Sequence, residues 1–259
     1  MTKEGTVPVE SLNLEPYARI ICYPRITHSD LEHKIEELSQ LGVEAIDFVG
    51  EIEIFGVPVI GKGCVGVVVR GHRKGERVAI KILRSDANRQ NLTQEAKMLK
   101  LANTVHVGPS YVDSSERILI MQHIDGSMIS QWADQLPANK RAIQSVLERI
   151  VDDCFKIDQI SLDHGELSRA AKHVIIDNKQ NPTLLDFETA SLNRRASNVT
   201  SICQYLFLRF QIGYKIRNAI DTMATVEIID TLKEYKRRPH LDSLNAVKSA
   251  CGLRPGNLG

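Results

Sequence analysis

Two hydrophobic patterns divide the chain. Short runs of β-branched residues between positions 46 and 83 are typical of strands joined by tight turns, because glycines separate them. The predicted strands cover 46–49, 52–55, 65–69 and 78–83. The connections are short, so the pattern favours an antiparallel meander over a parallel sheet.

After residue 84, apolar residues recur mainly at helical spacing. This spacing predicts helices near 88–102, 138–160, 198–213 and 215–235, and a strand at 118–121. Two more short apolar strands, 174–176 and 183–185, flank a polar turn. The pattern therefore indicates an α+β protein, with a β-rich part followed by a mainly helical part.

The first 45 residues precede both patterns. Thr27, Ser29 and Asp30 offer helix-capping side chains, and apolar residues follow at helical spacing until Gly42. We therefore expect an N-terminal extension over 1–50 with a short helix. A β-rich lobe with its connecting hinge is expected over 51–124, and a helical lobe over 125–259.

The composition is that of a folded chain without a global charge. Of 259 residues, 42% are hydrophobic and 25% are charged, and the formal net charge is +1. This balance removes any overall electrostatic argument for a nucleic-acid or anionic-membrane partner. A local basic cluster at 233–240 remains a candidate surface for an acidic or RNA partner, with a solvated helix end as the alternative. Its members are Lys233, Lys236, Arg237, Arg238 and His240.

Cysteine usage and hydropathy indicate a cellular compartment. Five scattered cysteines without a CxxC pair predict neither a disulfide framework nor a zinc site. No run approaches the ~20 apolar residues of a membrane span, and the N-terminus lacks the apolar run of a secretory signal. We expect a cytoplasmic protein with no membrane partner.

The first residues that suggest chemistry form a GxGxxG run. Gly61, Gly63 and Gly66 lie between two predicted strands. Glycines let the backbone approach a polyphosphate closely, and its amides can bind the phosphate oxygens. Because the run leads into a strand rather than a helix, it disfavours a dinucleotide-binding fold. A plain β-turn is the alternative.

Lys81 follows Gly66 by 15 positions, in the apolar segment Val-Ala-Ile-Lys. A lysine in a buried strand is costly unless its charge is paired, and Glu95 in the next predicted helix is the natural partner. Such a pair would fix the ammonium group where it can hold phosphate oxygens. The alternative is an edge strand on which Lys81 reaches solvent.

These features, in this order, resemble the small lobe of the protein-kinase fold, which carries a Gly-rich loop, a strand lysine and a helix glutamate. Asp186, in Leu-Asp-Phe-Glu, resembles the metal-binding aspartate of the DFG segment. The resemblance implies a two-lobed fold with an antiparallel-sheet N-lobe and a mainly helical C-lobe. It implies ATP and Mg²⁺ or Mn²⁺ as cofactors. It also implies a hinge that frames adenine, at Met121, Gln122, His123 and Ile124.

Among kinases, the short region after Asp186 resembles the RIO kinases and the small archaeal and eukaryotic kinases related to that of the KEOPS complex. Only about ten residues separate Glu188 from the next helical pattern, and the APE motif of longer activation segments is absent. The segment His164-Gly165-Glu166-Leu167 resembles the HGDL catalytic loop of these families. The resemblance therefore implies an atypical serine/threonine protein kinase.

The chain departs from the family pattern in its catalytic loop. The catalytic aspartate of the family falls on Glu166, and Asp163 is a second candidate for the carboxylate that accepts the hydroxyl proton. The family asparagine falls on Ala171 unless two residues are inserted, in which case His173 takes its place. His173 is then a candidate metal ligand, better suited to Mn²⁺ than to Mg²⁺. Alternatively it donates a hydrogen bond to a phosphate, orients a carboxylate, or is a packed structural residue.

Three functions follow from these residues. The first is ATP- and metal-dependent phosphoryl transfer to serine or threonine of an unknown protein substrate, including the chain itself. The second is a nucleotide-binding pseudokinase that acts as a scaffold or regulator, favoured by the missing aspartate and asparagine. The third is a small-molecule kinase of the same fold, disfavoured by the short region after Asp186.

Overall fold

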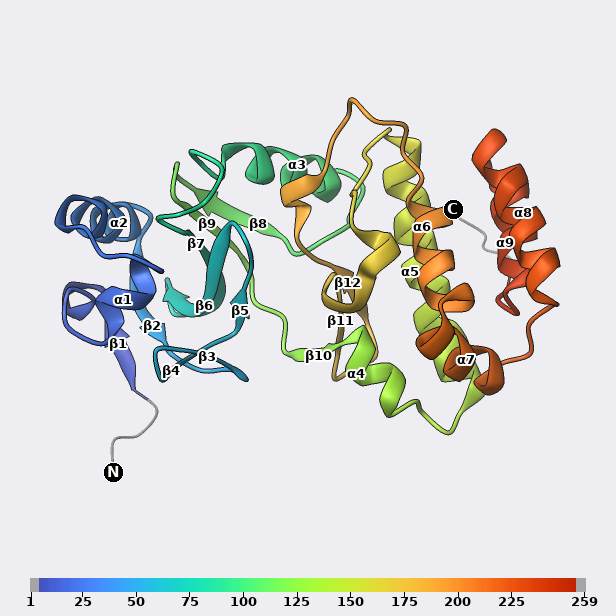
Figure 1. The fold of residues 1–259 in the computed structure, drawn as a ribbon, viewed down its shortest axis with the longest axis horizontal. Helices are drawn as coiled ribbons and strands as arrows, with labels where there is room; N and C mark the ends of the chain where they lie inside the picture. The colour runs from blue at the N-terminus through green and yellow to red at the C-terminus, as the bar shows by residue number, and fades with distance from the viewer. Residues whose placement is uncertain (1–4, 255–259) are drawn as a thin grey trace. The chain divides into compact units, whose positions relative to one another are not determined.

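The computed structural model describes residues 5–254. The chain divides into two compact units (Figure 1). The first contains the residues up to 100 together with 110–123, and the second contains 101–109 together with the residues from 124 onward. Helix α3 (Thr93–Asn103) begins in the first unit and ends in the second.

An antiparallel sheet forms the centre of the first unit. Its strands follow the order β1-β2-β6-β7-β9-β8, and β5 pairs with β6. Strands β3 (Ile52–Ile54) and β4 (Val57–Val59) make a separate hairpin. Every pairing among the described strands is antiparallel, as predicted. The predicted meander is corrected at its second strand, because β3 lies in the separate hairpin and β2 pairs directly with β6. The sheet consists of β1 (Thr6–Pro8), β2 (Val43–Asp47), β5 (Gly61–Lys62), β6 (Gly66–Arg73), β7 (Glu76–Leu83), β8 (Tyr111–Ser114) and β9 (Ile118–Gln122).

The N-terminal segment is part of this unit. The segment contributes β1, the 3₁₀ turn η1 (Val9–Ser11), α1 (Tyr17–Ile21), α2 (His28–Gln40) and β2. The sequence had suggested an extension separate from the sheet over 1–50, whereas β2 pairs with β6 and β1 with β2. An unpaired β6 would expose a row of backbone donors and acceptors, and β2 satisfies them.

The same segment also shares the hydrophobic core of the sheet. Leu12, Ile20 and Leu38 belong to one buried cluster with Ile80 and Ile120 of the central strands. The predicted short helix is present as α2, and Thr27 caps it by accepting a hydrogen bond from the Asp30 amide. The residues before the glycine run therefore help to build the unit that carries it.

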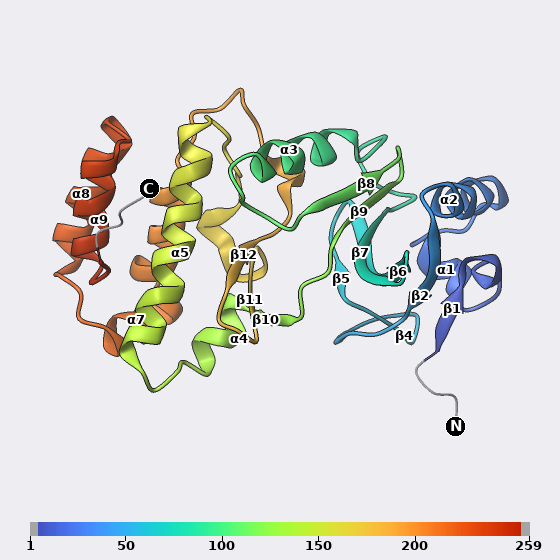
Figure 2. The same ribbon diagram turned by 180° about the vertical axis from the view of Figure 1, so that it is seen from behind.

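The second unit is mainly helical. Its sheet has three short antiparallel strands, β10 (Gly126–Met128), β11 (Val174–Asp177) and β12 (Pro182–Leu184). Figure 2 shows the long helix α5 (Lys140–Gln159) among its helices. The others are α4 (Ile129–Asp134), α6 (Asn198–Cys203), α7 (Phe210–Ala219), α8 (Thr225–Arg237) and α9 (Leu241–Ala250), with 3₁₀ turns η2 (Leu167–Lys172) and η3 (Phe187–Thr189) and a π-helical turn η4 (Gln204–Leu208).

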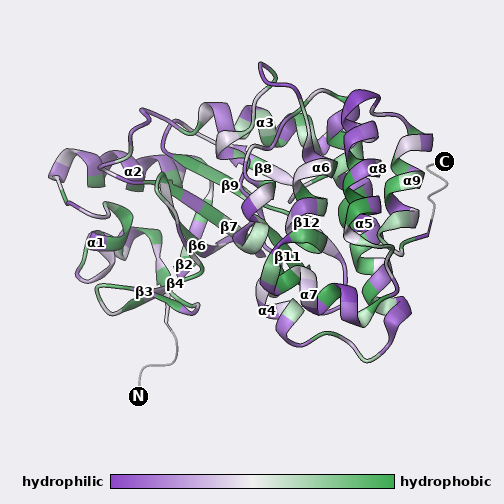
Figure 3. Cartoon of the chain, turned by 45° about the vertical axis from the view of Figure 1, so that its right-hand side comes forward, coloured by the Kyte–Doolittle hydropathy of each residue, from purple (hydrophilic) through white to green (hydrophobic). Residues whose placement is uncertain are grey.

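Helix α5 buries an apolar stripe, which includes Ile143, Val146, Ile150 and Ile157. In Figure 3, much of this helix is green, the colour of hydrophobic residues, as are β7 and β9 of the first unit. Asn139 caps α5 by accepting hydrogen bonds from the amides of Arg141 and Ala142. The helix predicted over 138–160 is therefore confirmed, with its first turn fixed by a side-chain cap.

The helices predicted over 198–213 and 215–235 have different boundaries. The π-helical turn follows α6, and Arg209 then takes an extended conformation before α7 begins. Ile220 is extended as well and ends α7, so that α8 is a separate helix. Helical spacing continues across these breaks, and the apolar pattern alone does not reveal them.

The protein therefore has a mixed α+β fold, as the sequence predicted. Among residues 5–254, no helix combines the length and the apolar character that crossing a membrane requires.

Candidate functional site

The first unit contains a buried ion pair between β7 and α3. Lys81 Nζ lies 2.8 Å from Glu95 Oε1, and the two residues are only 4% and 3% exposed. Lys81 lies on a central strand, between Val68 of β6 and Leu119 of β9, so it is not at a sheet edge. A buried ammonium group needs a carboxylate partner, and here the pair holds both charges in fixed positions.

The glycine run forms a tight turn beside this pair. The Gly63 amide donates a hydrogen bond to the Gly66 carbonyl at 2.9 Å. Gly66 begins β6, and a Cβ atom placed on it would lie 2.8 Å from Lys81 Cγ and 3.1 Å from Lys81 Cε. A side chain at position 66 would therefore clash with Lys81, whose side chain passes close to the Gly66 backbone.

Arg84 braces the same turn, a role that the sequence did not indicate. Its Nη1 donates to the Gly63 carbonyl at 2.8 Å, while Nε and Nη2 each donate to a carboxylate oxygen of Asp86 at 2.8 Å. The guanidinium carbon lies 4.9 Å from the centre of the Tyr23 ring, and Lys62 Nζ lies 4.8 Å from it. The N-terminal segment thus supplies an aromatic ring that lies within 5 Å of two cations, Lys62 in the glycine turn and Arg84 that braces it.

The predicted hinge residues lie at the end of β9. Met121 and Gln122 are its last residues, and the boundary between the two units falls after His123 and before Ile124. Gln122 is tied to Ser110 by two hydrogen bonds, from the Gln122 amide to the Ser110 carbonyl and from the Ser110 amide to Gln122 Oε1. These four residues therefore span the last of the three points at which the chain passes between the units.

In the second unit, His164 is the centre of a packed cluster. It is fully buried, and Nε2 lies 2.9 Å from the Leu185 carbonyl, to which it donates. Its ring lies 5.0 Å from that of Phe187 and 5.7 Å from that of His173. Burial lowers the pKa of His164 to about 4, so the ring is neutral at pH 7 and its role is structural.

Asn198 and Asp158 hold the backbone of this loop, and neither was expected from the sequence. Asn198 Oδ1 accepts from the His164 amide at 2.9 Å, and its Nδ2 donates to Asp158 Oδ1 and to the Leu162 carbonyl. Asp158 also accepts hydrogen bonds from Tyr235 and from the amides of Asn198 and Val199. Burial raises the pKa of the Asp158 carboxyl, against these bonds, which favour the carboxylate.

Asp186 lies where β12 ends and η3 begins, with a left-handed backbone at φ 68°. His173 Nδ1 lies 3.7 Å from its Oδ2. Asp186 and Glu188 each bring a carboxylate oxygen within 4.8 Å of the other. Two carboxylates at this separation offer the hard oxygen ligands that Mg²⁺ and Mn²⁺ prefer, so these residues fit such a metal.

The two candidate bases have different surroundings. Asp163 is 9% exposed, and Arg194 Nε donates to its carboxylate at 2.7 Å. Its backbone also pairs with Ser191 through two hydrogen bonds. Glu166 is half-buried, and Arg169 Nη2 lies 3.3 Å from Glu166 Oε2. Arg169 is itself 71% exposed, so Glu166 has the looser partner.

The structure therefore forms two local groupings from the predicted residues. Gly61, Gly63, Gly66, Lys81 and Glu95 belong to the first unit, and Glu166, His173 and Asp186 belong to the loops around His164 in the second. Ala171 lies in η2, and His173 rather than Ala171 is the residue beside Asp186.

The basic cluster at 233–240 lies at the end of α8 and in the turn after it. Lys233 pairs with Asp230 at 2.9 Å and Arg237 with Glu234 at 3.6 Å, both on the same helix. His240 accepts a hydrogen bond from the Ser243 amide and caps α9. Contacts within or at the end of a helix therefore account for Lys233, Arg237 and His240. An acidic or RNA partner for the cluster stays a prediction.

Comparison with known proteins supports a kinase-like fold. The chain is 24% identical over 152 residues to homeodomain-interacting protein kinase 4 of Mus musculus and, equally, to that of Rattus norvegicus. The match covers 52% of this chain and 24% of each relative, so the chain spans about a quarter of the length of the relatives it matches. No protein-family model matches the chain.

Proposed function

We propose that the protein is an atypical serine/threonine protein kinase that transfers the γ-phosphoryl group of ATP with the help of Mg²⁺ or Mn²⁺. The observation that carries the proposal is the buried Lys81–Glu95 pair beside a glycine turn. Such a pair holds an ammonium group ready for phosphate oxygens, as protein kinases require. The distant similarity to a protein kinase supports the same reaction class.

In this proposal the first unit binds the nucleotide. The backbone amides of Gly61, Gly63 and Gly66 cover the phosphates. Lys81 binds the phosphate oxygens, and Glu95 orients Lys81. The segment from Met121 to Ile124 frames adenine. When bound, the metal neutralises phosphate charge, and Asp186 with His173 or Glu188 would hold it.

Glu166 is the carboxylate that we assign as general base for the acceptor hydroxyl. Its partner Arg169 is 71% exposed and pairs at 3.3 Å, whereas Arg194 at 2.7 Å and the Ser191 backbone hold Asp163 in place. His164 supports this assignment, because its buried ring fixes the loop two residues before Glu166 against Leu185 and Phe187. The HGDL-like segment of RIO- and KEOPS-type kinases has the same residue order.

The test is incorporation of label from γ-labelled ATP with Mg²⁺ or Mn²⁺. Lys81→Ala and Asp186→Ala are expected to abolish it, while Lys97→Ala, at an exposed position of the same helix as Glu95, leaves it unchanged. Equal labelling in all four proteins would refute catalysis. Glu166→Gln is then expected to lower the turnover number more than Asp163→Asn at equal ATP affinity.

A nucleotide-binding pseudokinase is the second candidate function. The observation that favours it is the departure from the family pattern, with glutamate at position 166 and alanine at position 171. For a pseudokinase, ATP raises the melting temperature of the wild type, and no label is transferred. The same preparation therefore separates the two functions.

A further inference from the structure

A cavity of the second unit adjoins the loop that carries Glu166. Its volume is about 610 Å³, and α4, η2, η4 and α7 all contribute to its wall. Arg169 and Ala171 of η2 are among its lining residues. Because η2 begins at the residue after Glu166, a ligand in this cavity would lie one short turn from the proposed general base.

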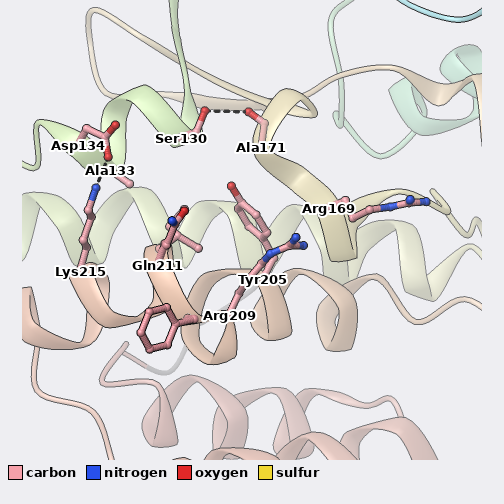
Figure 4. A pocket seen from close by; sticks show the side chains of 11 residues that line it. Ser130, Ala133, Asp134, Arg169, Ala171, Tyr205, Arg209, Gln211 and Lys215 are labelled. Atoms are coloured by element: carbon pink, nitrogen blue, oxygen red, sulfur yellow. Dashed lines mark hydrogen bonds and ion pairs between the residues drawn. The ribbon is translucent and has the colours of Figure 1, made fainter.

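The charges around the cavity are mostly positive. Arg169, Arg209 and Lys215 line it, against a single carboxylate from Asp134. Lys215 pairs with Asp134, and Figure 4 shows this pair, with Arg209 beside the Tyr205 ring. Arg209 is exposed, and its Nη1 makes one long bond, 3.3 Å, to the Ser168 carbonyl. Its remaining donors can therefore meet an anionic group.

The base of the cavity is apolar and its rim carries an exposed aromatic residue. Ala133, Tyr205 and Ile212 are buried, while Phe210 is 89% exposed. A phenylalanine this exposed at the first position of a helix is unusual, because contact with water brings it no stabilisation. The combination suits a partner that presents an apolar side chain next to carboxylates.

We propose that this cavity docks an acidic segment of the protein that receives the phosphoryl group. That the partner receives a phosphoryl group rests on the proposed function, and that its segment is acidic rests on the charges that line the cavity. An acidic peptide is the occupant we commit to, because the buried side chains of Ala133 and Ile212 can accept an apolar side chain next to the carboxylates; the exposed Phe210 ring could also stack on a base, and the RNA probe below tests that alternative. Arg169 connects the cavity to the reaction, since it lines the cavity and lies 3.3 Å from Glu166.

The test is binding of a fluorescent peptide with a serine between aspartates and a phenylalanine, followed by anisotropy without ATP. A peptide with lysines in place of the aspartates and an oligouridylate are the comparison probes. We expect the acidic peptide to bind the whole protein best, and added salt to weaken it. Arg209→Gln is expected to weaken binding about tenfold, as loss of one charge-assisted contact implies. Lys215→Gln is expected to weaken it less, because Lys215 already pairs with Asp134.

Matched substitutions outside the cavity serve as controls. Arg254→Gln and Lys179→Gln remove the same charges at exposed positions of the same unit and are expected to change the affinity by less than twofold. Equal losses in cavity and control variants, or equal binding of the lysine peptide, would overturn the proposal. Tighter binding of the oligouridylate that depends on Arg209 would overturn it in favour of RNA.

The outcome is separable from that of the proposed function. If the acidic peptide depends on Arg209 but no label leaves ATP, the cavity binds an acidic partner and the catalytic proposal fails. If label is transferred while the cavity variants bind the peptide like the wild type, the docking proposal alone fails. Thermal unfolding of each variant shows that the compared proteins are folded.

Discussion

Replacing Gly66 by alanine tests the close approach of the glycine turn to Lys81. The added Cβ would lie 2.8 Å from Lys81 Cγ and 3.1 Å from both Lys81 Cε and the Ile82 carbonyl oxygen. The Lys81 side chain cannot simply move aside, because Glu95 holds its Nζ at 2.8 Å. Overpacking of this kind costs about 1–3 kcal/mol, and we expect Gly66→Ala to lower the free energy of unfolding by that amount.

Gly63→Ala is the matched control in the same turn. A Cβ at Gly63 would have one neighbour, the Gly66 carbonyl oxygen at 3.6 Å, which is ordinary contact. We expect this variant to unfold within about 0.5 kcal/mol of the wild type, and both variants to be measured by urea denaturation. Equal unfolding free energies for the two variants would refute the reasoning.

A double-mutant cycle identifies Lys81 as the source of the clash. In a Lys81→Ala background, Cγ and Cε are absent, so Gly66→Ala is expected to cost less than it does in the wild type. Neighbouring residues that interact show coupling of at least about 0.5 kcal/mol. Strict additivity of the two substitutions would mean that the Ile82 carbonyl, rather than Lys81, accounts for the strain.

Three further results are expected. His164 is buried and neutral, with a pKa of about 4 against an ordinary value of 6.5, so the unfolded state takes up a proton first as the pH falls, and the free energy of unfolding decreases. Between pH 7 and pH 5 we expect the wild type to lose about 2 kcal/mol of unfolding free energy that His164→Gln does not lose, and parallel pH profiles would contradict this. Asn198→Ala leaves buried groups of His164, Leu162 and Asp158 unpaired and lowers the free energy of unfolding by about 2–4 kcal/mol, whereas the exposed control Asn193→Ala changes it by less than about 0.5. Arg84→Ala releases the Gly63 carbonyl and speeds amide hydrogen exchange across 62–66, and unchanged exchange there would show that the turn does not need this brace.

The strands and most helices were predictable because local patterns decide them. The antiparallel strands β6 and β7 follow from β-branched runs between glycines, and α5 follows from a long apolar stripe behind an asparagine cap. That β3 leaves the main sheet for a hairpin with β4 does not show in its apolar pattern. The break at Arg209 was not predictable, because η4 is a π-helical turn whose residues keep the apolar spacing of an ordinary helix.

The role of the first 50 residues depends on pairing over long distances in the sequence. Val43–Asp47 pairs with β6 more than twenty residues later, and nothing in its own composition identifies that partner. Tyr23 is similar, because its position between Lys62 and Arg84 depends on how α1 packs. The helix α2 was therefore predictable from local spacing, whereas the pairing by which this segment completes the sheet was not.

Among the candidate site residues, those with a short motif could be found and those that support them could not. Lys81 and Glu95 are recognisable because a charged residue in an apolar strand needs a partner. Asn198 and Asp158 are ordinary polar residues in the sequence, and only their burial against the His164 loop shows their role. A polar residue at the first position of a predicted apolar helix was the one signal for Asn198.

The central claim is that Lys81, held by Glu95, binds the phosphates of ATP. Calorimetric titration of the wild type and Lys81→Met with ATP, and separately with adenosine, tests it most directly, with Lys97→Met as control. We predict that Lys81→Met weakens ATP binding about tenfold or more and leaves adenosine binding unchanged, because only the phosphates meet the ammonium group. Equal ATP affinity in the wild type and Lys81→Met, or equal losses for ATP and adenosine, would contradict the claim.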